Sequence, residues 1–183
     1  MTKANLTNES IKWGIIAGLL FSLIQITSWT LGIKKYVSVV GIETFTPYII
    51  IIFLIAGLSI RKRNGGFLSF QEGLKFVFLA YVIVVVIEGI NNYILYNILD
   101  KDLTAKVIEE GKEKMIKMMQ KFGAPQEKID EAMKSANSER KQTDLKNILL
   151  GTGMSLIWYF VKSLLITLVI KKEQKLDETY LSQ

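Results

Sequence analysis

The chain contains neither cysteine nor histidine, and only two of its 183 residues are proline. These absences exclude disulfides, thiolate chemistry, histidine acid–base catalysis and most zinc or copper sites. The sequence also lacks a phosphate-binding loop, a dinucleotide-binding fingerprint and an HExxH motif. We therefore expect a protein that is not an enzyme and that binds neither a cofactor nor a metal.

Charge is absent from long stretches, and four apolar runs occupy much of the chain. About 20 apolar residues in a helix cross the hydrocarbon core of a membrane. The runs predict four transmembrane helices, over residues 12–33, 42–60, 75–98 and 147–170. The second run is clearly apolar only from Tyr48, so it reaches spanning length by extending back through Ile42. Because it is rich in isoleucine, we expect it to be the helix most exposed to lipid.

The predicted fold class is all-α: a polytopic membrane protein that forms a single domain over residues 1–183. A soluble four-helix bundle is the alternative, but YIIIIFLIAGL and FVFLAYVIVVVI leave no polar face for water. The first run is too long for a cleavable signal peptide, and we expect it to remain as the first span. The net charge of +6 is modest and gives no case for nucleic-acid binding. The expected partner is the lipid bilayer.

Basic residues beside the spans favour a cytoplasmic N-terminus and C-terminus. The connection between the third and fourth spans weakens this bias, because it carries eleven Lys and Arg against ten Asp and Glu. The basic residues that follow the second span or open the third are also a candidate site for anionic lipid headgroups. These residues are Arg61, Lys62, Arg63 and Lys75. The simpler interpretation is a structural turn, in which Ser69 and Glu72 form a capping box for the next helix.

The segment over about residues 99–146 predicts an amphipathic helical hairpin between the third and fourth spans, on the extracytoplasmic side. Apolar residues from Leu103 to Phe122 recur at spacings of mostly three, four or seven. Gly123 ends this helix, and Pro125 suits the first position of a second one. The apolar stripes favour packing of the two arms on each other or on the bundle. The alternative, which methionine-rich stripes keep open, is a surface over 102–136 for a protein partner or a second copy of the chain.

A single charge lies inside each of the last two spans, Glu88 in the third and Lys162 in the fourth. A charge at that depth costs about 2.5–3.5 kcal/mol on insertion scales. Other polar residues that share these helix faces, or that face the bundle from the first span, are Asn91, Asn92, Ser155, Tyr159 and Gln25. Three interpretations stay open: a structural ion pair, a cavity for an ion, proton or small polar ligand, and a Lys162 that reaches the surface and leaves Glu88 protonated.

Gly14, Gly18 and Ser22 recur at four-residue spacing in the first span. Small residues at this spacing let another helix approach closely, so they form a candidate packing face. The alternative is that glycine is simply common in membrane helices.

Several segments together resemble the bacterial membrane family called domain-of-unknown-function family 4199. They are IKWGIIAGL, GGFLSFQEGLK, YNILDKDL and GAPQEKIDEAM, and the resemblance extends over nearly the whole chain. It implies four spans in a bacterial inner membrane and carries no known activity. Two hypotheses follow for the function. One is a non-enzymatic structural or protein-interaction component that uses intramembrane helix packing and the hairpin. The other is a small oligomeric transporter or proton-linked permease subunit with Glu88 in a polar cavity.

Overall fold

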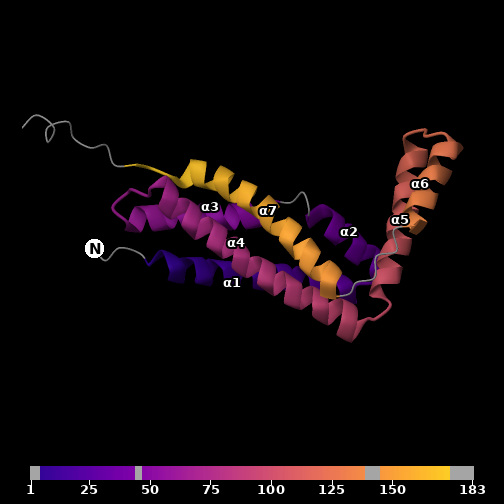
Figure 1. Cartoon of the computed structure of the whole chain (residues 1–183), viewed down its shortest axis with the longest axis horizontal. Coiled ribbons are helices and arrows are strands. Elements are labelled where there is room, and N and C mark those ends of the chain that lie inside the picture. Colours follow the sequence, from indigo (N-terminus) through magenta and orange to yellow (C-terminus); the bar gives the residue numbers. More distant parts are fainter. Residues whose placement is uncertain (1–4, 44–46, 139–144, 174–183) are drawn as a thin grey trace, which may run out of the picture. The chain divides into compact units, whose positions relative to one another are not determined.

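A computed structural model describes residues 5–43, 47–138 and 145–173, and these are mostly helical (Figure 1). The α-helices are α1 (Leu6–Thr30), α2 (Ile33–Glu43), α3 (Tyr48–Arg63), α4 (Phe70–Tyr93), α5 (Leu103–Lys121), α6 (Gln126–Ser138) and α7 (Leu145–Ile170). A π-helical segment, η1 (Ile94–Leu99), continues α4. The described residues contain no named strand, and the all-α prediction is confirmed.

Three helical segments are long and apolar enough to cross a membrane: Leu6–Thr30, Phe70–Leu99 and Gly153–Ile170. They indicate a multi-pass membrane protein. Helix α3 is equally apolar in its first part but has only 16 residues. The predicted extension of this helix back to Ile42 is wrong, because Ile42 belongs to α2 and Pro47 directly precedes α3. Proline is favoured at a helix start because its missing N–H would have no partner there.

The chain divides into two compact units. The first unit comprises Met1–Leu20, Pro47–Ile87 and Gly153–Gln183, and the second comprises Phe21–Thr46 and Glu88–Thr152. Helices α1 and α4 each contribute their first part to the first unit and their last part to the second.

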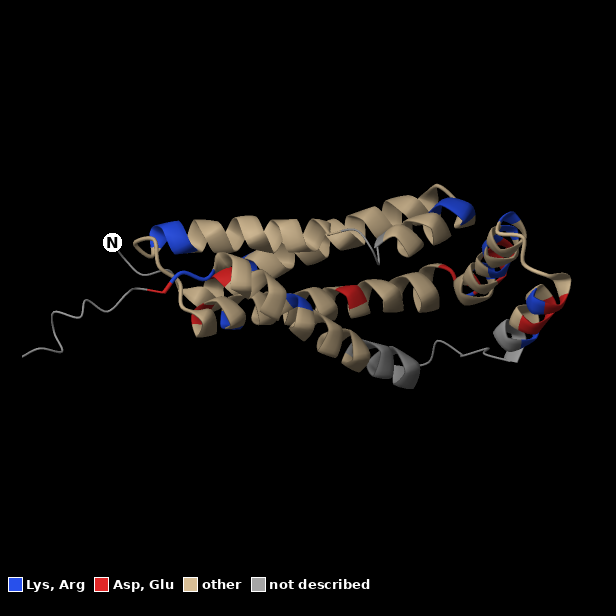
Figure 2. Cartoon of the chain, turned by 90° about the horizontal axis from the view of Figure 1, so that it is seen from above, with Lys and Arg blue, Asp and Glu red and all other residues tan. Residues whose placement is uncertain are grey.

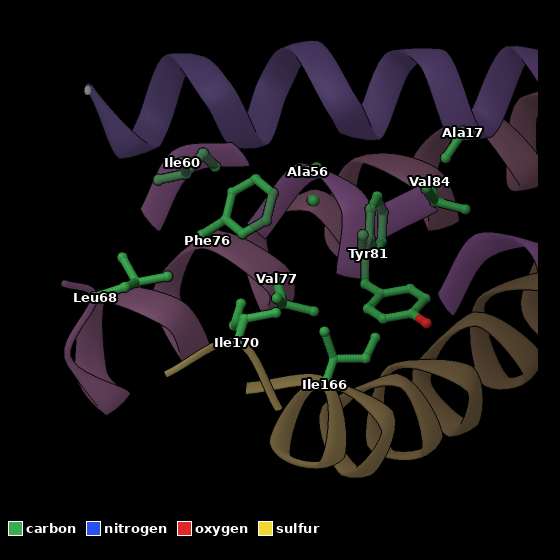
Figure 3. Close-up of a cluster of buried hydrophobic side chains, with 12 residues drawn as sticks. Ala17, Ala56, Ile60, Leu68, Phe76, Val77, Tyr81, Val84, Ile166 and Ile170 are labelled. Carbon is green, nitrogen blue, oxygen red and sulfur yellow. The ribbon is translucent and has the colours of Figure 1, made fainter. Parts of the chain in front are cut away.

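The core of the first unit is built by α1, α3, α4 and α7 (Figure 3). Phe53, at 0% exposed, lies at its centre and makes edge-to-face contacts with Phe76 and Tyr81, with ring centroids 6.4 Å and 4.8 Å away. Such contacts add to the burial of the rings themselves. Because α3 places Phe53, Ala56 and Ile60 in this core, the expectation that it is the most lipid-exposed helix is wrong.

The second unit has a small core of its own around Tyr36, Leu95 and Leu103. Helix α5 packs on α2, and α5 and α6 contact each other. These two helices occupy the segment predicted as a hairpin. Gly123 lies between them with a φ of +71°, a conformation that glycine adopts without steric cost. Helix α6 begins at Gln126, one residue later than predicted, and its Ile129 is buried.

Candidate functional site

Gly14 and Gly18 of α1 lie directly against α4 in the first unit. A Cβ atom at Gly14 would lie 2.7 Å from the carbonyl oxygen of Ala80, and one at Gly18 would lie 2.7 Å from Cδ1 of Ile87. A side chain at Gly14 would have to displace the backbone of α4, whereas one at Gly18 would have to displace the Ile87 side chain, so glycine favours the close contact at both positions. The face is therefore occupied by α4 of the same chain. Docking of a second chain there, as the interaction hypothesis supposed, does not fit the structure.

The last parts of α1 and α4, which belong to the second unit, carry buried polar side chains. Gln25 and Ser28 of α1 are 4% and 3% exposed, and Asn91 of α4 is 5% exposed. Ser28 donates a hydrogen bond from Oγ to the carbonyl oxygen of Gln25, at 2.8 Å. Ser22 Oγ and Asn91 Nδ2 are buried and have no hydrogen-bond partner among the described residues. A buried polar group without a partner costs free energy.

Glu88 belongs to the second unit, where it and Asn92 are half-buried on α4. Lys162 belongs to the first unit and is half-buried on α7. Because the two charges lie in different units, their pairing stays a prediction.

Within the first unit, Lys162 lies over aromatic rings of its own helix. Its Nζ is 5.1 Å from the ring centroid of Tyr159 and 5.9 Å from that of Trp158, distances typical of cation–π contacts. The Tyr159 ring stacks on Tyr81 at 4.7 Å with an interplanar angle of 11°. Ser155, the remaining polar residue of this predicted face, is half-buried one turn before Tyr159. The sequence indicated the polar face but not the contribution of the rings to holding the ammonium group.

The basic residues at one end of the first unit hold its helices together. Arg63 forms an ion pair with Glu9 at 2.8 Å, which joins the end of α3 to the start of α1. Arg61 donates from Nη1 to the carbonyl oxygen of Ile170 at 3.1 Å, which joins α3 to the end of α7. Lys62 and Lys75 are exposed. Of the four residues predicted to bind lipid headgroups, two are therefore engaged by the protein itself.

A short antiparallel backbone bridge completes this end and was not predicted. Leu68 N donates to Lys172 O at 2.9 Å, and Lys172 N donates to Leu68 O at 2.8 Å. The bridge joins the α3–α4 connection to the residues that follow α7. Next to it, the predicted capping box is present: the Ser69 N–H and hydroxyl both donate to Glu72 Oε2, at 3.0 Å and 2.9 Å, and Glu72 N donates to Ser69 Oγ at 3.3 Å.

An ionic contact lies in the second unit where η1 ends. Lys106 Nζ donates to both carboxylate oxygens of Asp100, at 2.8 Å and 2.9 Å. This hydrogen bond holds the pKa of the Asp100 carboxyl below its ordinary value. Further along α5, Lys114 Nζ donates to Ser38 Oγ at 2.7 Å and to the carbonyl oxygen of Lys34 at 3.2 Å, which ties α5 to α2.

Over residues 5–43, 47–138 and 145–173, no group of three or more Asp and Glu side chains could hold a metal ion. The arrangement offers instead a closely packed helix pair, buried polar groups, a basic end and an amphipathic helix pair. Comparison with curated proteins and with solved structures finds no match. Residues 12–172 match the family described as "Protein of unknown function (DUF4199)". The match covers most of the chain, and the protein belongs to this family.

Proposed function

We propose that this protein is a non-enzymatic structural component of a bacterial cytoplasmic membrane, and that it associates with a second copy of itself. It crosses the membrane four times and has both termini in the cytoplasm. Helices α5 and α6 form an extracytoplasmic hairpin that makes the contact between copies.

The contacts of the first unit support four spans. Ser10 Oγ of α1 donates to the carbonyl oxygen of Phe76 in α4 at 3.0 Å, so these helices start at the same end and run in the same direction. The Arg63–Glu9 pair places the end of α3 beside the start of α1. The chain must therefore return between α1 and α4, and α3 is the apolar helix that does so. Its 16 residues cover about 24 Å, which approaches the roughly 30 Å of the hydrocarbon core.

The distribution of basic residues supports the orientation. Figure 2 shows Lys and Arg mainly at the ends of the long helices and along α5 and α6, with few charged positions between them. At the end where α1 and α4 start and where α3 and α7 finish, basic residues outnumber acidic ones. Basic residues next to spans face the cytoplasm. Helices α5 and α6 then lie outside the cytoplasm.

The observation that carries the proposal is the exposure of Phe122, which directly follows α5. Its side chain is 82% exposed, and Met118, one turn earlier, is 59% exposed. A single exposed apolar side chain is common on protein surfaces, but these two are neighbours on one helix face, which favours a contact surface. The same segment carries nearly equal numbers of basic and acidic residues. Such a surface does not repel a copy of itself, so we assign a second copy of the chain as its partner.

The absence of cysteine makes this contact directly testable by cross-linking. The variant Phe122→Cys has one cysteine, and we expect it to form a disulfide-linked dimer when membranes are mildly oxidised. Lys134→Cys is the matched control, because Lys134 is an exposed residue of α6 away from Phe122. We expect the control to stay monomeric. Equal cross-linking of both variants, or of neither, would contradict self-association through this surface.

The buried atoms of the second unit favour a second candidate function. Ser22 Oγ and Asn91 Nδ2 have no partner among the described residues, and Glu88 lies one helical turn before Asn91. A small polar ligand that accepts a hydrogen bond from Asn91 Nδ2 would satisfy that atom, as in a transporter or proton-linked permease subunit. Such a role requires Glu88 to face a hydrated cavity, whereas the structural role requires it to hold the fold.

A further inference from the structure

The backbone bridge between Leu68 and Lys172 fixes the position of Lys171 and Lys172, the two lysines that follow α7. Both backbone hydrogen bonds of the bridge are short, and Leu68 is 0% exposed, so the segment is anchored in the core of the first unit. The Nζ of Lys171 lies 5.8 Å from the ring centroid of Phe70, and that of Lys172 lies 5.7 Å from the ring centroid of Phe67. Two ammonium groups are thus held beside two aromatic rings that flank the bridge residue Leu68 in the sequence.

The positive charge around the bridge exceeds the negative charge near it. The described residues at this end include seven basic side chains (Lys12, Arg61, Lys62, Arg63, Lys75, Lys171 and Lys172) and three acidic ones (Glu9, Glu72 and Glu173). Glu9 binds Arg63, and Glu72 caps α4. Lys171 and Lys172 are exposed, and within the described residues neither makes an ion pair. An anion would therefore be attracted to these lysines.

The surface directly before the lysines is apolar. Leu165, Leu168 and Val169 of α7 are 62%, 54% and 61% exposed. Phe67, beside Lys172, is 37% exposed. A cationic group directly above an exposed apolar surface matches the boundary where a phospholipid changes from acyl chain to phosphate. A free phosphate ion would use the charges only, whereas a phospholipid uses both surfaces.

We propose that Lys171 and Lys172, positioned by the bridge and by Phe67 and Phe70, bind the phosphate group of an anionic phospholipid. The acyl chains of that lipid lie along the apolar surface of α7. The proposal rests on the proposed function only in placing this end of the molecule at the membrane surface. Lys171 and Lys172 take the role that the sequence assigned to Arg61 and Arg63, because both arginines are engaged by the protein itself.

The test is a titration of the purified full-length chain, in a neutral maltoside detergent, with phosphatidylglycerol. The shift in the thermal unfolding temperature measures binding. Each lysine near an anionic surface strengthens binding about fivefold, so we expect the double variant K171Q/K172Q to bind about 30-fold more weakly than the wild-type chain. The matched control K101Q/K121Q removes the same charge from exposed lysines of the second unit and is expected to bind like the wild type.

Three outcomes would overturn the proposal. The first is equal binding by the wild type and K171Q/K172Q, and the second is equal stabilisation by phosphatidylcholine. The third is full stabilisation by inorganic phosphate alone, which would identify a free-phosphate site. A further variant, Phe67→Leu, keeps every charge and should weaken binding by a smaller factor. Because the titration does not involve Phe122, its failure is distinguishable from failure of the dimer contact.

Discussion

At the residue scale, Glu88 and Lys162 are the side chains that cost the most free energy to place inside a membrane. A charged group loses more hydration energy on leaving water than a neutral group does. The Lys162 ammonium group makes cation–π contacts with Tyr159 and Trp158 of its own helix, and these contacts offset part of that cost. Glu88 lies among the polar side chains of α4. If these charges stabilise the fold, they support the structural function. If Glu88 instead binds an ion or a proton, it supports the transporter function.

If Glu88 and Lys162 form the ion pair that the sequence predicts, Glu88→Gln and Lys162→Met should each lower the free energy of unfolding by about 3–5 kcal/mol, because each would leave one buried charge unpaired. The double variant should recover much of the loss, because it buries no charge at all. Thermal unfolding and oligomeric state in detergent measure both effects. Single variants that are as stable as the wild type would show that the charges do not hold the fold. Glu88 would then be the residue to test for proton or ion movement in liposomes.

At the scale of the elements, local sequence signals located the helices well, although not every boundary. The capping box of Ser69 and Glu72 and the break at Gly123 are where the sequence predicts them, since each depends on residues within four positions of one another. Helix α2 was missed as a separate element. Its residues continue the apolar pattern on both sides, so periodicity alone did not separate it from its neighbours.

The contact between α1 and α4 gives a sharp prediction about glycine. Gly14→Ala places a Cβ 2.7 Å from a backbone oxygen of Ala80, which cannot move without displacing α4. We expect a loss of about 1–3 kcal/mol in the free energy of unfolding, as for other overpacked positions. Gly89→Ala is the control, because a Cβ there meets nothing within 4 Å. Alanine favours helix over glycine by up to about 1 kcal/mol, so the control should be unchanged or stabilised. Equal thermal stability of the two variants would contradict the close approach.

At the scale of the whole molecule, the proposed arrangement of four spans would fix which segments lie on the same side of the membrane. It requires α3 to cross, and the packing of Phe53 and Ile60 in the core of the first unit is consistent with that path. With three spans, α1 and α4 would have to start on opposite sides. The hydrogen bond between Ser10 and Phe76 shows that both helices start at the same end of the first unit, which argues against three spans.

Single cysteines can be labelled in intact cells with a maleimide that does not cross membranes. We expect Asn8→Cys and Gln71→Cys to react only after permeabilisation, because both exposed positions lie at the basic end of the first unit. Gln120→Cys, on α5, should react in intact cells. Opposite behaviour of Asn8→Cys and Gln71→Cys would contradict four spans. Reversal of all three would retain four spans and contradict the orientation.

The sequence by itself predicted most of the helices and four apolar runs, because length and local composition set both properties. Three of those runs lie in helices that are long and apolar enough to span a membrane. The sequence also located the intramembrane charges and the small-residue face. Only the tertiary structure decided that α3 lies in the core, that Arg61 and Arg63 join helices and that Lys172 pairs with Leu68. These contacts join residues far apart in the chain, such as Arg61 and Ile170, which are 109 positions apart. Local patterns extend over one or two helical turns, so they cannot show which helices become neighbours.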